Sequence, residues 1–189
     1  MKFNKIVVIL LVGGIVLTMA YFLNKKRNID DGRHGTGYYE DYNFKKKPKV
    51  IKSTDIISFK IDFEDGNTVD DSKLPYGRYY ISLEKTDDIG KLSFTFRGYG
   101  EVILIEKDLP LEVFINLQKI IEDENVEEIN GYCFNNTALG YFLDLEILYE
   151  SGEKITAYAE GGSVNPQGFN GKALVEFFYN MVEEELEKE

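Results

Sequence analysis

Residues 57–64 read ISFKIDFE, and this stretch decides the fold of the larger part of the chain. Its odd positions are apolar and its even positions are polar, which is the period of a β-strand with one buried face and one wet face. The same alternation returns at 79–84, 92–97 and 141–149, each range bounded by turn residues. Because short turns connect most of these strands, we expect a mostly antiparallel sheet.

Two segments have a helical period instead. Pro110 is suited to a first helical turn, with Asp108 or Leu109 as the cap and the helix end near Asn125. A second helix follows Asn170 and carries its apolar residues on one face. Further short strands are expected at 102–105 and 155–159, and a loop at 131–140. The sequence therefore predicts an α+β domain of order ββββ-α-ββ-α, with two helices covering one face of the sheet.

The segment Ile6–Leu23 reads IVVILLVGGIVLTMAYFL and contains no charged residue. Eighteen helical residues rise about 27 Å, close to the hydrocarbon thickness of a bilayer. We expect an uncleaved transmembrane helix, because signal peptides have shorter apolar cores of about 7–15 residues. A cleaved signal peptide is the alternative, although its best cleavage motif, Thr18-Met19-Ala20, begins with threonine.

The expected organisation is a tail at 1–5, a transmembrane signal anchor at 6–23, a flexible stalk at 24–48 and an acidic domain at 49–189. Five Lys and Arg residues flank the span, two before it and three after it, so the positive-inside rule does not decide its orientation. A short basic tail is typical of a signal anchor, which favours the cell membrane with an extracytoplasmic domain. This layout resembles that of single-pass envelope proteins of Gram-positive bacteria, although no motif is characteristic of a named family.

The charge of the chain limits its partners. The net charge is −11, and residues 49–189 contain 29 of the 33 acidic side chains. Such a domain repels phosphate groups, so we expect no nucleic acid partner. The membrane, through Ile6–Leu23, and a protein of the envelope are the expected partners, and the oligomeric state stays open.

Several kinds of chemistry lack the residues that they need. His34 is the only histidine and lies in the stalk, and Cys133 is the only cysteine. Catalytic triads and zinc sites draw on more of these residues, so we predict no catalytic residue, no metal and no cofactor. The acidic stretch Asp62–Asp71 also fails as a calcium loop, because Lys73 occupies the position of the final glutamate.

Two candidate sites remain. The loop GGSVNPQGFN, residues 161–170, leads to a helix N-terminus whose free N–H groups could hold an anionic ligand group. The predicted ligand-binding residues are Ser163, Asn165, Asn170 and Gly171. The alternative is an ordered connector in which Asn170 caps the helix and Phe169 packs on the core.

The second candidate is a pair of carboxylates. Asp144 and Glu146 project from the same face of one strand, about 7 Å apart along it, a spacing that glycosidases use. The first functional hypothesis is nevertheless a domain that acts by protein or envelope contact, without catalysis. A small-ligand binder using the loop 161–170 is the alternative, and a hydrolase with an unrecognised site is the third.

Overall fold

The computed structural model describes residues 49–65, 74–98, 100–135, 140–161, 169 and 171–186. Every structural statement below concerns those residues. The predicted transmembrane span and stalk lie outside them. Within the described part of the chain, no helix is long and apolar enough to cross a membrane.

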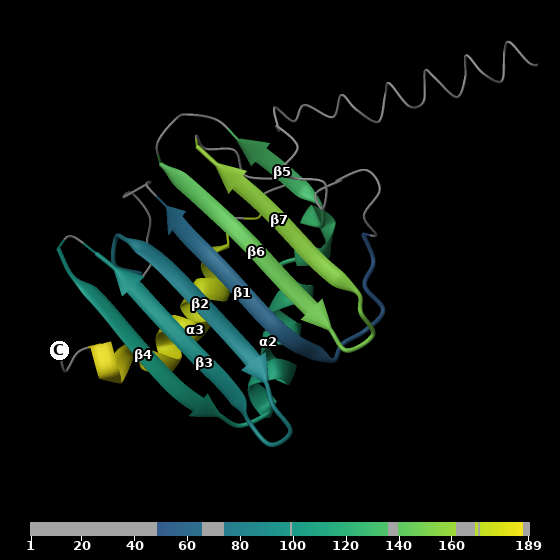
Figure 1. Cartoon of the computed structure of the whole chain (residues 1–189). Helices are drawn as coiled ribbons and strands as arrows, with labels where there is room; N and C mark the ends of the chain where they lie inside the picture. Colours follow the sequence, from purple (N-terminus) through teal and green to yellow (C-terminus); the bar gives the residue numbers. More distant parts are fainter. Residues whose placement is uncertain are drawn as a thin grey trace, which may run out of the picture. The chain divides into compact units, whose positions relative to one another are not determined.

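A seven-stranded sheet forms the centre of the domain, in the order β4-β3-β2-β1-β6-β7-β5 (Figure 1). All neighbouring strands are antiparallel except β5 and β7, which run parallel. The strands are β1 (Ile56–Asp65), β2 (Arg78–Lys85), β3 (Gly90–Arg97), β4 (Val102–Leu109), β5 (Tyr132–Asn135), β6 (Tyr141–Tyr149) and β7 (Lys154–Glu160). The predicted class, an α+β domain with a mostly antiparallel sheet, is confirmed.

Two helices, α2 (Glu112–Asp123) and α3 (Lys172–Leu186), lie on the same side of the sheet (Figure 1). A short 3-10 helix, η1 (Val126–Ile129), follows α2 and contacts β7. From Phe59 onward, the apolar positions of the alternation in β1 are buried in one cluster with residues of the helices. The expectation that Ile57 joins them was wrong, because a register shift between Ile56 and Ser58 places Ile56 in the core and leaves Ile57 half-buried. Phe59 of β1 packs on Phe178 of α3 with ring centroids 5.1 Å apart. The apolar side chains of the strands and those of the two helices thus form a single hydrophobic core.

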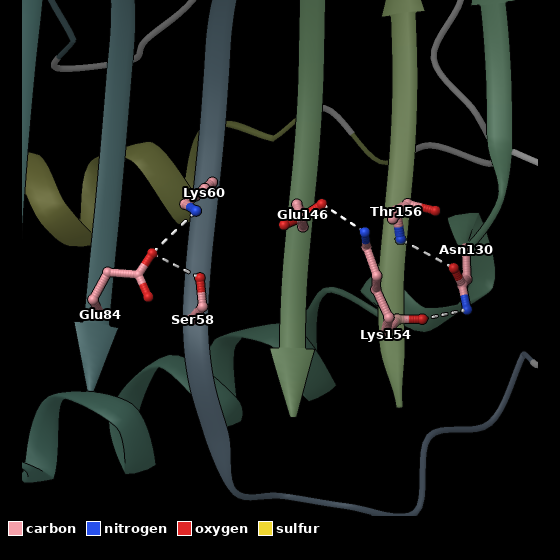
Figure 2. A network of polar contacts seen from close by, with 7 residues as sticks. All are labelled: Ser58, Lys60, Glu84, Asn130, Glu146, Lys154 and Thr156. Atoms are coloured by element: carbon pink, nitrogen blue, oxygen red, sulfur yellow. Dashed lines mark hydrogen bonds and ion pairs between the residues drawn. The ribbon is translucent and has the colours of Figure 1, made fainter. Parts of the chain in front are cut away.

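The prediction of a loop at 131–140 was wrong for its first part, which is strand β5. Asn130, which is fully buried, ties this strand to β7. Its side-chain amide donates to the carbonyl of Lys154, and its side-chain oxygen accepts from the N–H of Thr156, at 3.0 Å each (Figure 2). Gly131, at φ 78°, continues the connection by donating its N–H to the Thr156 carbonyl. Two residues before β5 therefore set its pairing.

The start of the first helix also differs from the prediction. Strand β4 is longer than the expected 102–105, because it pairs with β3 from Val102 to Leu109, where Gly90 is the partner. Asp108 and Leu109 are therefore strand residues and not caps. Leu111 is the N-cap of α2, without a side-chain hydrogen bond. Pairing with β3 therefore keeps Asp108 and Leu109 in the strand, although their sequence favours a helix cap.

Candidate functional site

The face of the sheet opposite α2 and α3 is called the open face. Its middle row follows from the strand register, since residues directly opposite one another point to the same side. This row consists of Leu104, Thr95, Tyr80, Asp62, Asp144 and Tyr158. These side chains are exposed or half-buried, in contrast to the buried positions that alternate with them. The open face thus presents polar, aromatic and charged groups on a frame of paired strands.

The open face is hollowed at its centre. One hollow of about 400 Å³ spans four strands and is lined by Lys60, Ile61, Asp62, Tyr80, Ile81, Ser82, Ser93, Thr95, Asp144 and Glu146. A second hollow of about 510 Å³ lies toward β4 and shares Ser82 and Ser93 with the first. The two hollows, which we call the depression, therefore adjoin at this pair of serines. Ser82 and Ser93 are opposite one another in the β2–β3 register.

Ion pairs between neighbouring strands surround the first hollow. Glu84 reaches from β2 to β1, where its carboxylate lies 3.1 Å from the Lys60 ammonium and accepts a 3.0 Å hydrogen bond from the Ser58 hydroxyl (Figure 2). On the other side, Lys154 of β7 lies 2.6 Å from the carboxylate of Glu146 (Figure 2). The two pairs hold Lys60 and Glu146 in defined positions at the hollow.

Arg78 organises the third polar contact. Its Nε and Nη2 atoms each donate a 2.7 Å hydrogen bond to the carboxylate of Asp62, and this contact raises the pKa of Arg78 above its usual value. The same guanidinium lies 4.0 Å from the centre of the Phe142 ring and 5.1 Å from that of Tyr80. Arg97 lies 5.6 Å from the Tyr80 ring. Arginine and aromatic side chains thus form a fixed cluster beside the hollow.

Asp144 and Glu146 both line the hollow. The spacing of Asp144 and Glu146 in the sequence does not indicate their neighbours on the next strand. In the structure Asp62 lies directly opposite Asp144, and Lys60 lies directly opposite Glu146. The alternation in 57–64 predicts that Lys60 and Asp62 lie on the solvent-facing side of a strand. It does not predict that they lie beside the carboxylates of β6, because that register joins segments about 80 residues apart in the sequence.

The predicted loop site lies mostly outside the described residues, since Ser163, Asn165 and Asn170 are not among them. Gly171 is buried at φ 76°, and a β-carbon added there would lie 3.1 Å from the ring of Phe63. Phe169 belongs to the buried core. These two contacts agree with a connector packed on the core, and ligand binding by the loop stays a prediction.

Cys133 is buried in β5, and the described residues include no group of three His, Cys, Asp or Glu side chains that could hold a metal ion. No protein-family model matches the sequence, and no curated protein is significantly similar to it. The proposed function therefore rests on the arrangement of residues on the open face.

Proposed function

We propose that the chain is a single-pass membrane protein of a bacterial envelope, whose acidic domain lies outside the cytoplasm and acts by contact. Residues 6–23 are its membrane anchor, and the contact surface is the open face. The observation that carries the proposed contact surface is the depression, because its lining residues include the polar positions of the open face. Its partner is a protein or another component of the envelope.

The composition of the open face supports a role in binding. Arginine and aromatic residues contribute most of the binding energy in many protein interfaces, and Arg78, Tyr80 and Phe142 form one cluster here. Val102 and Leu104 of edge strand β4 add apolar surface, with exposed fractions of 62% and 60%. Because strands carry all these residues, little backbone conformational entropy is lost when a partner binds.

The same geometry favours binding over acid catalysis. A carboxyl group that donates a proton near neutral pH is usually buried in apolar surroundings. Glu146 instead lies against Lys154, and its side chain is 40% exposed. Turnover of a cell-wall fragment, a peptide or a phosphoester that is lost in Asp144→Asn or Glu146→Gln would overturn the proposal and favour the hydrolase.

Site-specific photo-crosslinking in intact cells tests the contact surface. A photoreactive residue at Leu104 lies on the open face, and one at Ile115 of α2 is a matched control, because its side chain is 61% exposed on the helical layer. We expect a discrete adduct from position 104 and none from position 115. Equal labelling at both positions, or none at 104, contradicts the proposed surface.

Protease treatment of intact cells or spheroplasts, with a tag after Glu189, tests the location. Loss of the tag from outside, with the anchor retained in the membrane, is the expected result. Protection of the tag would place the domain in the cytoplasm, and an envelope partner would then be excluded.

A further inference from the structure

We infer that the depression binds a neutral saccharide chain. This inference rests on the proposed function and specifies the ligand of the same surface. Its basis is a set of hydroxyl groups that have no partner among the described residues, the ion-paired charges around them, and the continuity of the two hollows.

The hydroxyls of Ser82, Ser93 and Thr95 line the first hollow, and none of them forms a hydrogen bond with another described residue. Each hydroxyl can donate one hydrogen bond and accept others. A sugar hydroxyl has the same double capacity, so the two sets of groups can pair in either direction. Ser82 and Ser93 lie directly opposite one another on adjacent strands, which fixes the spacing of the pair.

The charges around these hydroxyls disfavour an ionic ligand. Four charged side chains line the hollow. Lys60, Asp62 and Glu146 each form an ion pair, with Glu84, Arg78 and Lys154 respectively, and Asp144 is also engaged in an interaction. An anion would approach the carboxylates of the hollow, and a cation would approach the ammonium and guanidinium groups that pair with them. A neutral polyol avoids both repulsions, because its hydroxyls donate to carboxylates and accept from ammonium groups.

The second hollow continues this pattern toward the edge of the sheet. There Lys91 lies between Glu84 and Asp108 in the register, so a positive charge again separates two carboxylates, and Glu106, opposite Ser93, adds a third carboxylate. The first hollow, about 400 Å³, is within the usual range for a small-ligand site. Because the second adjoins it at Ser82 and Ser93, the depression suits a chain of linked rings better than a single sugar.

Calorimetric titration of the full-length protein in detergent micelles tests the inference with four probes. Maltotetraose and the tetramer of N-acetylglucosamine are neutral, the tetramer of glucosamine is cationic, and tetragalacturonate is anionic. We expect at least one neutral tetramer to bind, and both charged tetramers to bind at least about tenfold more weakly.

The double variant Ser82→Ala/Ser93→Ala removes the two hydroxyls where the hollows meet. Because these groups have no partner among the described residues, its melting temperature should equal that of the wild type. Its affinity for the neutral tetramer should fall about tenfold, the size expected for two lost hydrogen bonds. Ser53→Ala is the matched control, since it removes a hydroxyl outside the depression and should leave the affinity unchanged.

Each other outcome has a defined meaning. If neither neutral tetramer binds, or if a charged tetramer binds more tightly, the inference is wrong. Where crosslinking from Leu104 persists in that case, the proposed contact surface stands and its partner is not a neutral saccharide. Binding that the serine variant does not weaken also contradicts the inference, because the ligand then lies elsewhere.

Discussion

Asp62 of β1 lies directly opposite Asp144 of β6 on the open face of the sheet. Like charges in directly opposite positions destabilise an antiparallel pair of strands. Arg78 of β2 counters this, since its two hydrogen bonds of 2.7 Å bring a positive charge to Asp62. The guanidinium of a third strand therefore offsets the charge of one of the two facing carboxylates in the central strands β1 and β6.

Arg78→Met should therefore lower the free energy of unfolding by about 1.5–3 kcal/mol, the range for hydrogen bonds to a charged group. Methionine retains much of the apolar stem, so the loss reports mainly on the guanidinium. In an Asp62→Asn background the same change should cost less, because the charge that Arg78 offsets is gone. Urea unfolding of the four proteins measures this coupling. Equal losses in both backgrounds would contradict the role assigned to Arg78.

Tyr149 and Tyr79 are both almost fully buried, but their hydroxyls differ. The Tyr79 hydroxyl donates to the carbonyl of Pro75, whereas that of Tyr149 has no partner among the described residues. Tyr149→Phe should leave stability unchanged or raise it by up to about 1 kcal/mol, and Tyr79→Phe should lower it by about 1 kcal/mol. Urea unfolding compares the two variants. A loss in Tyr149→Phe equal to that in Tyr79→Phe would show that the Tyr149 hydroxyl has a partner, such as a bound water.

Most of the sheet was predictable because its strands alternate with little interruption. The odd positions from Phe59 to Phe63 are buried in β1, as their pattern predicts, and the same holds in β6. Strand β5 was missed because it has only four residues and depends on Asn130, whose bonds to Lys154 and Thr156 join distant parts of the chain. A single-sequence pattern contains no signal for such a contact.

The candidate site was only partly predictable for the same reason. The common face of Asp144 and Glu146 follows from strand geometry alone. Their neighbours Lys60, Asp62 and Ser93 come from β1 and β3, and only the order of the strands in the sheet brings them together. The loop residues, by contrast, are predicted from local glycine and asparagine signals, which are visible in a sequence without knowledge of strand pairing.

Glu153, in the turn between β6 and β7, holds the segment through which the chain enters the domain. Its carboxylate accepts hydrogen bonds from the backbone N–H groups of Lys52 and Ser53, at 3.2 and 2.9 Å. These bonds, led by that from Lys52, lower the pKa of Glu153 below its usual value of 4.5. A carboxyl whose pKa is lower in the folded state stabilises the fold above the unfolded-state pKa, and this contribution is lost as the pH falls through the folded-state pKa.

Glu153→Gln should therefore be less stable than the wild type at neutral pH, and the difference should shrink as the pH falls below 4.5. Urea midpoints across the pH range measure the difference. Faster amide exchange at Lys52 and Ser53 in the variant is the local readout. Glu150→Gln is the matched control, because Glu150 is exposed in the same turn and its carboxylate forms no hydrogen bond with a described residue. A difference between Glu153→Gln and wild type that persists at low pH would contradict the assignment.

Gly171, which precedes α3, combines a left-handed backbone with close packing. At φ 76° any L-residue is strained by about 1–2 kcal/mol, and a β-carbon would also lie 3.1 Å from the Phe63 ring. Gly152, at φ 84° with nothing within 4 Å, isolates the backbone effect. We expect Gly171→Ala to lower the free energy of unfolding by about 1–3 kcal/mol more than Gly152→Ala does, the usual cost of overpacking a core. Equal losses in the two variants would show that Phe63 moves aside freely, and that the start of α3 is not held against the core.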